Sequence, residues 1–172
     1  ARIAQERGLQ VAMCDDISSK EPMVDAEGTI LNADIFRWLD EGASYSALET
    51  AAGFADAELE KDRYGNDIKV YEEVVQYDPA TLARSILIPL AQLTPKGADK
   101  ALTVDDYRWS KDKSKILIYT NAEYVWREKD RGDYWVRDQT TNELWQLGGE
   151  LSAPGEMMFG KLSPDGLKFA YV

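Results

Sequence analysis

"YRWSKDKSKILIY", residues 107–119, is the central copy of a segment that recurs along the chain. It aligns without a gap on "FRWLDEGASYSAL" at 36–48 and on "GKLSPDGLKFAYV" at 160–172. In each copy a strand leads into a polar turn and alternating apolar residues follow, which is typical of a β-hairpin. In the first and third copies along the chain, glycine occupies a turn position that needs positive φ, and in the second copy Lys113 occupies it. The sequence therefore predicts one hairpin repeated three times.

A second hairpin pattern follows the first two copies. "VVQYDPATLARSILI" at 74–88 and "YWVRDQTTNELWQLG" at 134–148 each contain an Asp-x-x-Thr turn between two strands. The side chains of Asp78 and Asp138 are expected to accept hydrogen bonds from the backbone two residues further on. Two hairpins in series predict a four-stranded antiparallel sheet, and the sequence repeats that sheet.

We predict an all-β fold, a β-propeller fragment of about two and a half four-stranded antiparallel blades. The hairpin copies start at residues 36, 107 and 160, farther apart than the roughly 40 to 50 residues of compact propeller repeats. Loops must therefore be inserted, and the charged stretch "GFADAELEKDRYGND" at 53–67 is one of them. A β-sandwich also contains many short strands, but the same turn chemistry in the same order favours a propeller.

The domain organisation follows from where the repeat begins. Residues 1–31 fit neither hairpin pattern, and we leave this N-terminal segment unassigned. Residues 32–172 are expected to form a partial N-terminal β-propeller domain. The chain begins without methionine and its last residues read as the middle of a strand, so we expect it to be a fragment of a longer protein.

Composition excludes several classes of function. With 20 Lys and Arg against 31 Asp and Glu, the net charge of −11 would repel a phosphate backbone, so we expect no nucleic-acid partner. The absence of histidine removes the usual general base and the commonest metal ligand. We expect no catalytic residue, no metal site and no cofactor in this chain.

Three further sequence features have ordinary structural interpretations. The Arg-Gly-Asp tripeptide at 131–133 matches an adhesion motif, but a turn before the strand "YWV" explains it better. Adjacent carboxylates at Asp105 and Asp106 are expected to cap a turn rather than to bind a metal. The tryptophans at positions 38, 109, 135 and 145 are expected to pack between blades.

Trp126 and Arg127 are the candidate functional residues. They lie in "EYVWREKDRGD", between two apolar strand sequences. One interpretation is a solvated loop whose arginine pairs with a neighbouring carboxylate. The other is an arginine whose fork of donors is aimed at a carbonyl or carboxylate while the aromatic ring steadies its stem. Spacing does not choose between them.

Residues 34–172 resemble the N-terminal β-propeller of the dipeptidyl peptidase IV family, within the prolyl oligopeptidase superfamily of serine peptidases. The motifs that carry this resemblance are "YVWREKDRGDYWVRD", "LTVDDYRWSKDKSKILIYTN" and "MMFGKLSPDGLKFAYV", with "FRWLDEG" and "VVQYDPAT" in the preceding blade. The resemblance implies that Arg127 helps hold the substrate backbone near its N-terminus, with Trp126 in a supporting role.

The same resemblance implies a role for the parent protein. It would be a serine exopeptidase that releases N-terminal dipeptides from peptides with a free N-terminus. A C-terminal α/β-hydrolase domain of the same chain would carry the triad, and a later propeller segment the paired glutamates. No Gly-x-Ser-x-Gly sequence occurs here. An exported location (secreted, periplasmic or cell-surface) is implied, and a homodimer of the full-length protein is compatible with it.

Two alternatives stay open from the sequence. The chain could be a non-catalytic β-propeller that binds a protein or peptide ligand. The parent could also be a peptidase that acts on acylated or internal peptides, in which case the later pair of glutamates would be missing.

Overall fold

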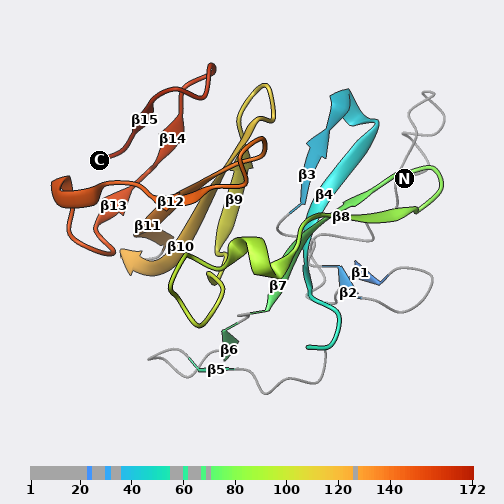
Figure 1. Cartoon of the computed structure of the whole chain (residues 1–172), viewed down its shortest axis with the longest axis horizontal. Coiled ribbons are helices and arrows are strands. Elements are labelled where there is room, and N and C mark those ends of the chain that lie inside the picture. The colour runs from blue at the N-terminus through green and yellow to red at the C-terminus, as the bar shows by residue number, and fades with distance from the viewer. Residues whose placement is uncertain are drawn as a thin grey trace. The chain divides into compact units, whose positions relative to one another are not determined.

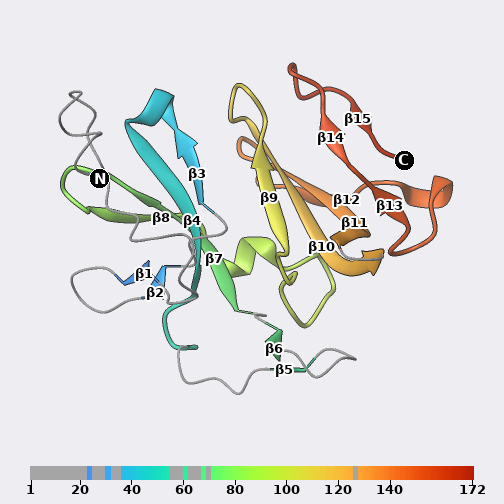
Figure 2. The same ribbon diagram turned by 180° about the vertical axis from the view of Figure 1, so that it is seen from behind.

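The computed structural model describes residues 23–24, 30–31, 36–54, 60–61, 67–68, 71–125 and 128–172. These residues form short strands and three 3-10 turns (Figures 1 and 2). The chain divides into two compact units, 1–49 with 74–87 and 50–73 with 88–172, and each is described by itself.

The first four-stranded sheet has the order β3-β4-β7-β8 and the second the order β12-β11-β10-β9, with β13 pairing on β11. The strands of the first are β3 (Phe36–Leu39), β4 (Ser44–Thr50), β7 (Glu72–Tyr77) and β8 (Arg84–Ile88). Those of the second are β9 (Asp106–Trp109), β10 (Lys115–Val125), β11 (Glu128–Asp138), β12 (Leu144–Gln146) and β13 (Met157–Met158).

Three two-stranded hairpins complete the fold. They are β1 (Met23–Val24) with β2 (Ile30–Leu31), β5 (Glu60–Lys61) with β6 (Asp67–Ile68), and β14 (Lys161–Leu162) with β15 (Phe169–Ala170). The 3-10 turns are η1 (Asp40–Gly42), η2 (Leu90–Leu93) and η3 (Gly149–Leu151). Two four-stranded antiparallel sheets followed by one further hairpin confirm the predicted fold class. The boundary at residue 32 stays a prediction.

The first sheet buries a small aromatic core. Ala47 on β4 and Val75 and Tyr77 on β7 are at most 3% exposed, and Tyr45 packs against them. The rings of Tyr45 and Tyr77 stack with centroids 5.4 Å apart. The Tyr77 hydroxyl donates to the buried carboxylate of Glu49. The other oxygen of this carboxylate, Oε2, lies 2.9 Å from Arg84 Nε. The polar end of the core is thus satisfied by hydrogen bonds, as burial requires.

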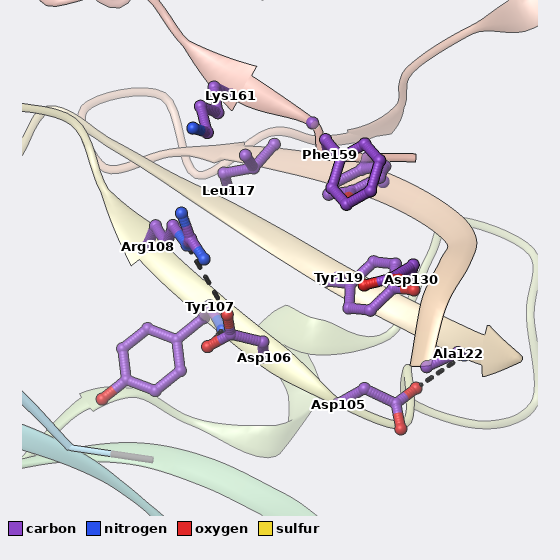
Figure 3. Close-up of a pocket in the computed structure, with 12 residues that line it drawn as sticks. Asp105, Asp106, Tyr107, Arg108, Leu117, Tyr119, Ala122, Asp130, Phe159 and Lys161 are labelled. Atoms are coloured by element: carbon purple, nitrogen blue, oxygen red, sulfur yellow. Dashed lines mark hydrogen bonds and ion pairs between the residues drawn. The ribbon is translucent and has the colours of Figure 1, made fainter. Parts of the chain in front are cut away.

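The second sheet has apolar residues on both faces of β10. Ile116, Leu117 and Ile118 are all at most 3% exposed although they alternate across the sheet. On the Leu117 face a cluster continues through Tyr134 and the β14–β15 hairpin, whose aromatic residues pack against it. A pocket of about 440 Å³ opens beside this cluster, bounded by β9, β10, β11 and the start of β14 (Figure 3). The repeated hairpin therefore covers the sheet that precedes it.

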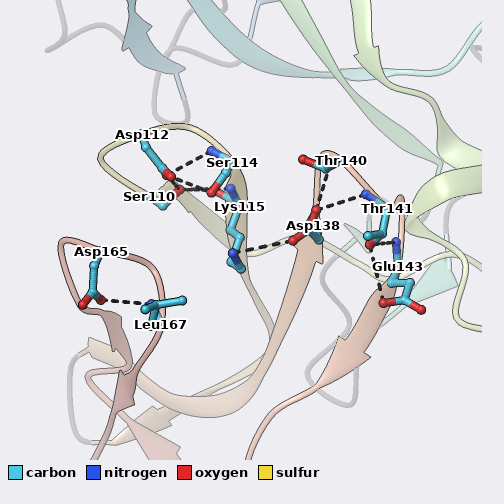
Figure 4. Close-up of polar contacts among 10 residues, drawn as sticks. All are labelled: Ser110, Asp112, Ser114, Lys115, Asp138, Thr140, Thr141, Glu143, Asp165 and Leu167. Atoms are coloured by element: carbon cyan, nitrogen blue, oxygen red, sulfur yellow. Dashed lines mark hydrogen bonds and ion pairs between the residues drawn. The ribbon is translucent and has the colours of Figure 1, made fainter.

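The Asp-x-x-Thr turns have the predicted hydrogen bonds in both sheets, and Figure 4 shows those of the turn at Asp138. The Oδ1 atom of Asp78 accepts from the backbone N–H groups two and three residues further on, at 2.8 and 2.9 Å. Asp138 accepts from the corresponding groups at 2.8 and 3.1 Å. In each turn the residue four positions after the aspartate has positive φ, 58° at Leu82 and 60° at Asn142.

The turns of the repeated hairpin also match atom for atom. In the second copy the Ser110 hydroxyl donates to Asp112 at 2.7 Å, and in the third Ser163 donates to Asp165 at 2.5 Å. Each serine Oγ also accepts from the backbone N–H five residues on, at 3.0 and 2.9 Å. The turn position predicted to need positive φ has a positive φ in both copies, 59° at Lys113 and 67° at Gly166.

Two of the four tryptophans are exposed in this chain, and packing between blades stays a prediction. Trp38 is 54% exposed and Trp145 is 39% exposed. The Trp38 ring makes an edge contact with Tyr45, at a centroid distance of 5.9 Å. Side-chain size marks these residues as core candidates, but the strand face on which each lies decides its burial.

Leu82→Asn should stabilise the chain by about 0.5–1 kcal/mol, because the short polar side chain of asparagine can hydrogen-bond to the local backbone in the left-handed region and that of leucine cannot. Leu82 is 53% exposed, so the change removes no buried contact. Leu82→Ala is the matched control and should show no such gain, since alanine has no polar side chain. Urea unfolding midpoints of the three proteins measure the difference, and equal midpoints for leucine and asparagine would contradict it.

Acid should weaken the turns. Hydrogen bonds from the hydroxyl of Ser110, and then from Ser114, lower the pKa of Asp112 from its ordinary 3.8 to about 2. Its contribution to stability is therefore complete above about pH 4 and is lost as the pH falls through about 2. Asp78, Asp138 and Asp165 have lowered pKa values for the same kind of reason, bonds from nearby backbone N–H groups or a serine hydroxyl.

The free energy of unfolding should therefore decrease between about pH 4 and about pH 2. Asp112→Asn should make that decrease shallower without abolishing it, because the other three aspartates remain. Urea titrations at several pH values make the measurement. A slope that is the same in the variant would show that Asp112 does not contribute.

Candidate functional site

The hairpin of β10 and β11 extends well beyond the rest of its sheet. Both strands have 11 residues, and their pairing is regular from Lys115↔Asp138 to Thr120↔Asp133. Beyond that pair lie residues 121–132, which we call the hairpin arm. Its register shifts twice, between Thr120 and Glu123 and between Glu123 and Val125. Such irregularities bend a strand and redirect its side chains.

The first irregularity is fixed by hydrogen bonds to side chains. Asn121 has a φ of 55°, a left-handed conformation that asparagine tolerates. The backbone N–H of the next residue, Ala122, donates to Asp105 Oδ2 at 2.9 Å (Figure 3). Asp105 immediately precedes β9, so the segment that enters the sheet holds the base of the arm.

Two further contacts hold the arm from its other strand. Arg131 Nη2 lies 3.0 Å from Glu123 Oε2 across the ladder, with the two side chains 42% and 34% exposed. Exposed pairs of this kind contribute about 0.2–1 kcal/mol. Arg131 also pairs through its backbone with Met158 on β13. The base of the arm is therefore held by the segment before β9 and by β13 as well as by its own two strands.

The Arg-Gly-Asp tripeptide lies inside β11 rather than in a turn before it, which corrects the sequence prediction. A β-carbon at Gly132 would lie 2.7 Å from the Thr120 carbonyl oxygen and 2.7 Å from the Tyr119 ring. Asp133 is 4% exposed and accepts hydrogen bonds from Asn121 and Gly155. An aspartate bound in this way is not presented to an adhesion receptor, and the tripeptide is part of the sheet.

The pocket lies at the base of the arm. Ala122 and Asp130 of the arm line it together with Asp105, Tyr119 and residues at the start of β14 (Figure 3). Burial is the main cause that raises the pKa of Tyr119 and of Tyr134 above the usual value of 10. Both hydroxyls therefore stay protonated near neutral pH and can donate hydrogen bonds.

The two adjacent aspartates have separate partners. Asp105 binds the backbone of Ala122, whereas Asp106 accepts from the N–H of Tyr107 at 2.8 Å and lies 3.5 Å from Arg108 Nε. No group of three or more metal-ligating side chains occurs in the part of the chain that the structure describes. The chemistry available at this site is hydrogen bonding and charge.

Trp126 and Arg127 lie outside the described residues. They join Val125 to Glu128, whose backbones pair across the ladder, so both flanking strands of the candidate site are described. The roles of these two residues stay predictions. The sequence analysis did not identify Asn121 or the hydrogen-bonding role of Asp133, because an asparagine and an aspartate 12 residues apart form no recognisable motif.

Comparison with known proteins supports the fold and part of the family assignment. The family model described as the dipeptidyl peptidase IV (DPP IV) N-terminal region matches residues 110–172. The crystal structure of Porphyromonas gingivalis dipeptidyl peptidase 4 is similar over 84% of this chain, with a TM-score of 0.57 and 18% identity. This chain spans 17% of the length of that protein. No curated protein sequence matches the chain.

The resemblance to the N-terminal region of the DPP IV family is thus confirmed, in sequence for residues 110–172 and in fold for most of the chain. The matched residues include the hairpin arm. Among the residues described, no helix has the length and apolar composition needed to cross a membrane.

Gly132→Ala should destabilise the chain by about 1–3 kcal/mol, the usual cost of forcing an extra carbon into a packed site. One of the two contacts of the added β-carbon would be with the backbone oxygen of Thr120, which cannot rotate away. Thermal unfolding of the variant and of the parent provides the comparison, and an unchanged midpoint would refute the steric explanation.

Proposed function

We propose that this chain is the N-terminal propeller portion of a DPP IV-like serine exopeptidase, which removes dipeptides from the free N-terminus of peptides. The propeller gates the path of the substrate and Arg127 helps bind the substrate backbone near its amino end. Trp126 supports the arginine from the neighbouring position. The observation that carries this proposal is the family match over residues 110–172, which contains the arm and both candidate residues.

The construction of the arm suits that role. Arginine presents five N–H donors in a rigid planar fork and stays charged at every physiological pH. A charge-assisted hydrogen bond to a substrate carbonyl contributes about 1.5–3 kcal/mol. That contribution requires the donor to be held in place before the substrate arrives, since immobilising a long side chain has its own entropic cost. A hairpin held at Asp105, Glu123 and Met158 supplies a fixed base for it.

The catalytic groups lie outside this chain in the proposal. The sequence contains no histidine, so the Ser-His-Asp triad would come from a C-terminal α/β-hydrolase domain of the same parent. The paired glutamates that hold the substrate amine would come from a later propeller segment. The chain alone would then be inactive, and its contribution is to select substrates by length and orientation.

Two properties of the parent belong to the same proposal. An exported location, whether secreted, periplasmic or at the cell surface, fits this kind of exopeptidase. A homodimer of the full-length protein is compatible with it as well. The tests below do not depend on either property.

In the full-length parent, Arg127→Ala should lower kcat/KM by about one to two powers of ten on Gly-Pro and Ala-Pro p-nitroanilides. The loss corresponds to the charge-assisted hydrogen bond given above. Arg127→Lys should fall between parent and alanine, because it keeps the charge without the planar fork. Lys111→Ala removes an exposed cation from the same unit and is the matched control, with no expected change.

The outcomes separate the alternatives. Unchanged kcat/KM in Arg127→Ala would remove the substrate-binding role. A folded parent that cleaves neither compound, and whose reading frame lacks a Gly-x-Ser-x-Gly sequence, would favour a propeller that binds a protein or peptide without hydrolysing it. Cleavage confined to acylated or internal peptides would keep the peptidase and change its specificity.

A further inference from the structure

Asp133 is a buried carboxylate that binds two separate segments of the chain. It is 4% exposed. Its Oδ2 accepts from Asn121 Nδ2 at 2.8 Å, and its Oδ1 accepts from the backbone N–H of Gly155 at 2.8 Å. Gly155 belongs to the connection between β12 and β13, which returns the chain to β11. One side chain therefore joins the base of the arm to the connection that leads into β13.

The two bonds act where the ladder stops being regular. Thr120↔Asp133 is the last regular pair, and Asn121 is the first residue beyond it, in a left-handed conformation. The direction in which the arm leaves the sheet depends on the backbone angles of that residue. A hydrogen bond that fixes the Asn121 side chain against a buried group restricts those angles. The bond between Ala122 and Asp105 restricts the next residue in the same way.

We propose that Asp133 is a positioning residue for substrate binding. It fixes the direction in which the arm leaves the sheet, through its bonds to Asn121 and Gly155. The inference rests on the proposed function, because it assigns a purpose to the arm only if Arg127 contacts the substrate. Asp133 itself touches no substrate and takes part in no chemical step.

The chemistry of this pair allows an exchange experiment. A carboxylate accepts at both oxygens, whereas an asparagine at the same position has one acceptor and one donor group. Asp133→Asn alone need not lose a bond, because the Asn121 amide can turn over and accept from the new amide at 133. Asn121→Asp must lose one, since it places a second acceptor against the Asp133 carboxylate. In the double variant Asn121→Asp/Asp133→Asn, the amide at 133 can accept from Gly155 and donate to the new carboxylate. The exchange restores both bonds with nearly unchanged side-chain volumes.

In the full-length parent, Asn121→Asp should lower kcat/KM on Ala-Pro p-nitroanilide by about tenfold, mainly by raising KM. The exchange variant should recover to within about twofold of the parent. In the Arg127→Ala background, Asn121→Asp should cause no further loss, because the proposed substrate contact is already absent. A general loss of stability would lower the amount of active enzyme equally in both backgrounds.

Asn121→Gly is the second variant, for the case in which Asn121→Asp does not fold. Glycine keeps the positive φ without strain and removes only the donor to Asp133. It should lower kcat/KM in the parent background and not in the Arg127→Ala background.

Parent-like kcat/KM in both single variants would overturn the inference while Arg127→Ala could still show the proposed function. A loss that persists unchanged in the Arg127→Ala background would also overturn it. If Arg127→Ala is itself neutral, the proposed function fails and the role of Asp133 fails with it.

Discussion

The hairpin turns of both units depend on aspartates that accept the backbone N–H groups of the turn. Tight reversals leave such groups without ladder partners, and an aspartate that accepts them favours the turn conformation over others. Asp78 and Asp138 satisfy two N–H groups each, at distances of 2.8 to 3.1 Å. The turn fixes the register of the strands that it joins. The register then decides which side chains, such as Val75 and Val136, are buried.

Both four-stranded sheets depart from the common pattern at the connection between their second and third strands. In the first sheet β4 and β7 are joined by a long segment that contains β5 and β6. In the second, β10 continues directly into β11 and forms the hairpin arm. Connections at one place in a repeated sheet can change without disturbing the turns that set its register. Functional differences between blades can therefore accumulate there.

The sequence predicted the parts of the fold that rest on local chemistry. The turn aspartates, the repeated polar turn and the left-handed position at Lys113 follow from spacing and residue type, and the repeat made them recognisable. The exposure of Trp38 was not predictable in this way, because burial depends on the neighbours of a strand face. The bond between Asn121 and Asp133 was not predictable either, since a register shift alone brings the two side chains together.

A two-stranded hairpin alone is marginally stable in water, so a binding residue at the end of one would sample many positions. The hairpin arm has contacts that an isolated hairpin lacks: Asp105 before β9, Asp133 on β11 with Gly155, and the pairing with β13. Each restricts the arm from a different segment of the chain. Displacements of about 1 Å can reduce turnover a hundredfold, so a substrate-binding arginine requires such restriction more than an ordinary loop does. The supports therefore fit a functional arm better than a loop that only joins two strands.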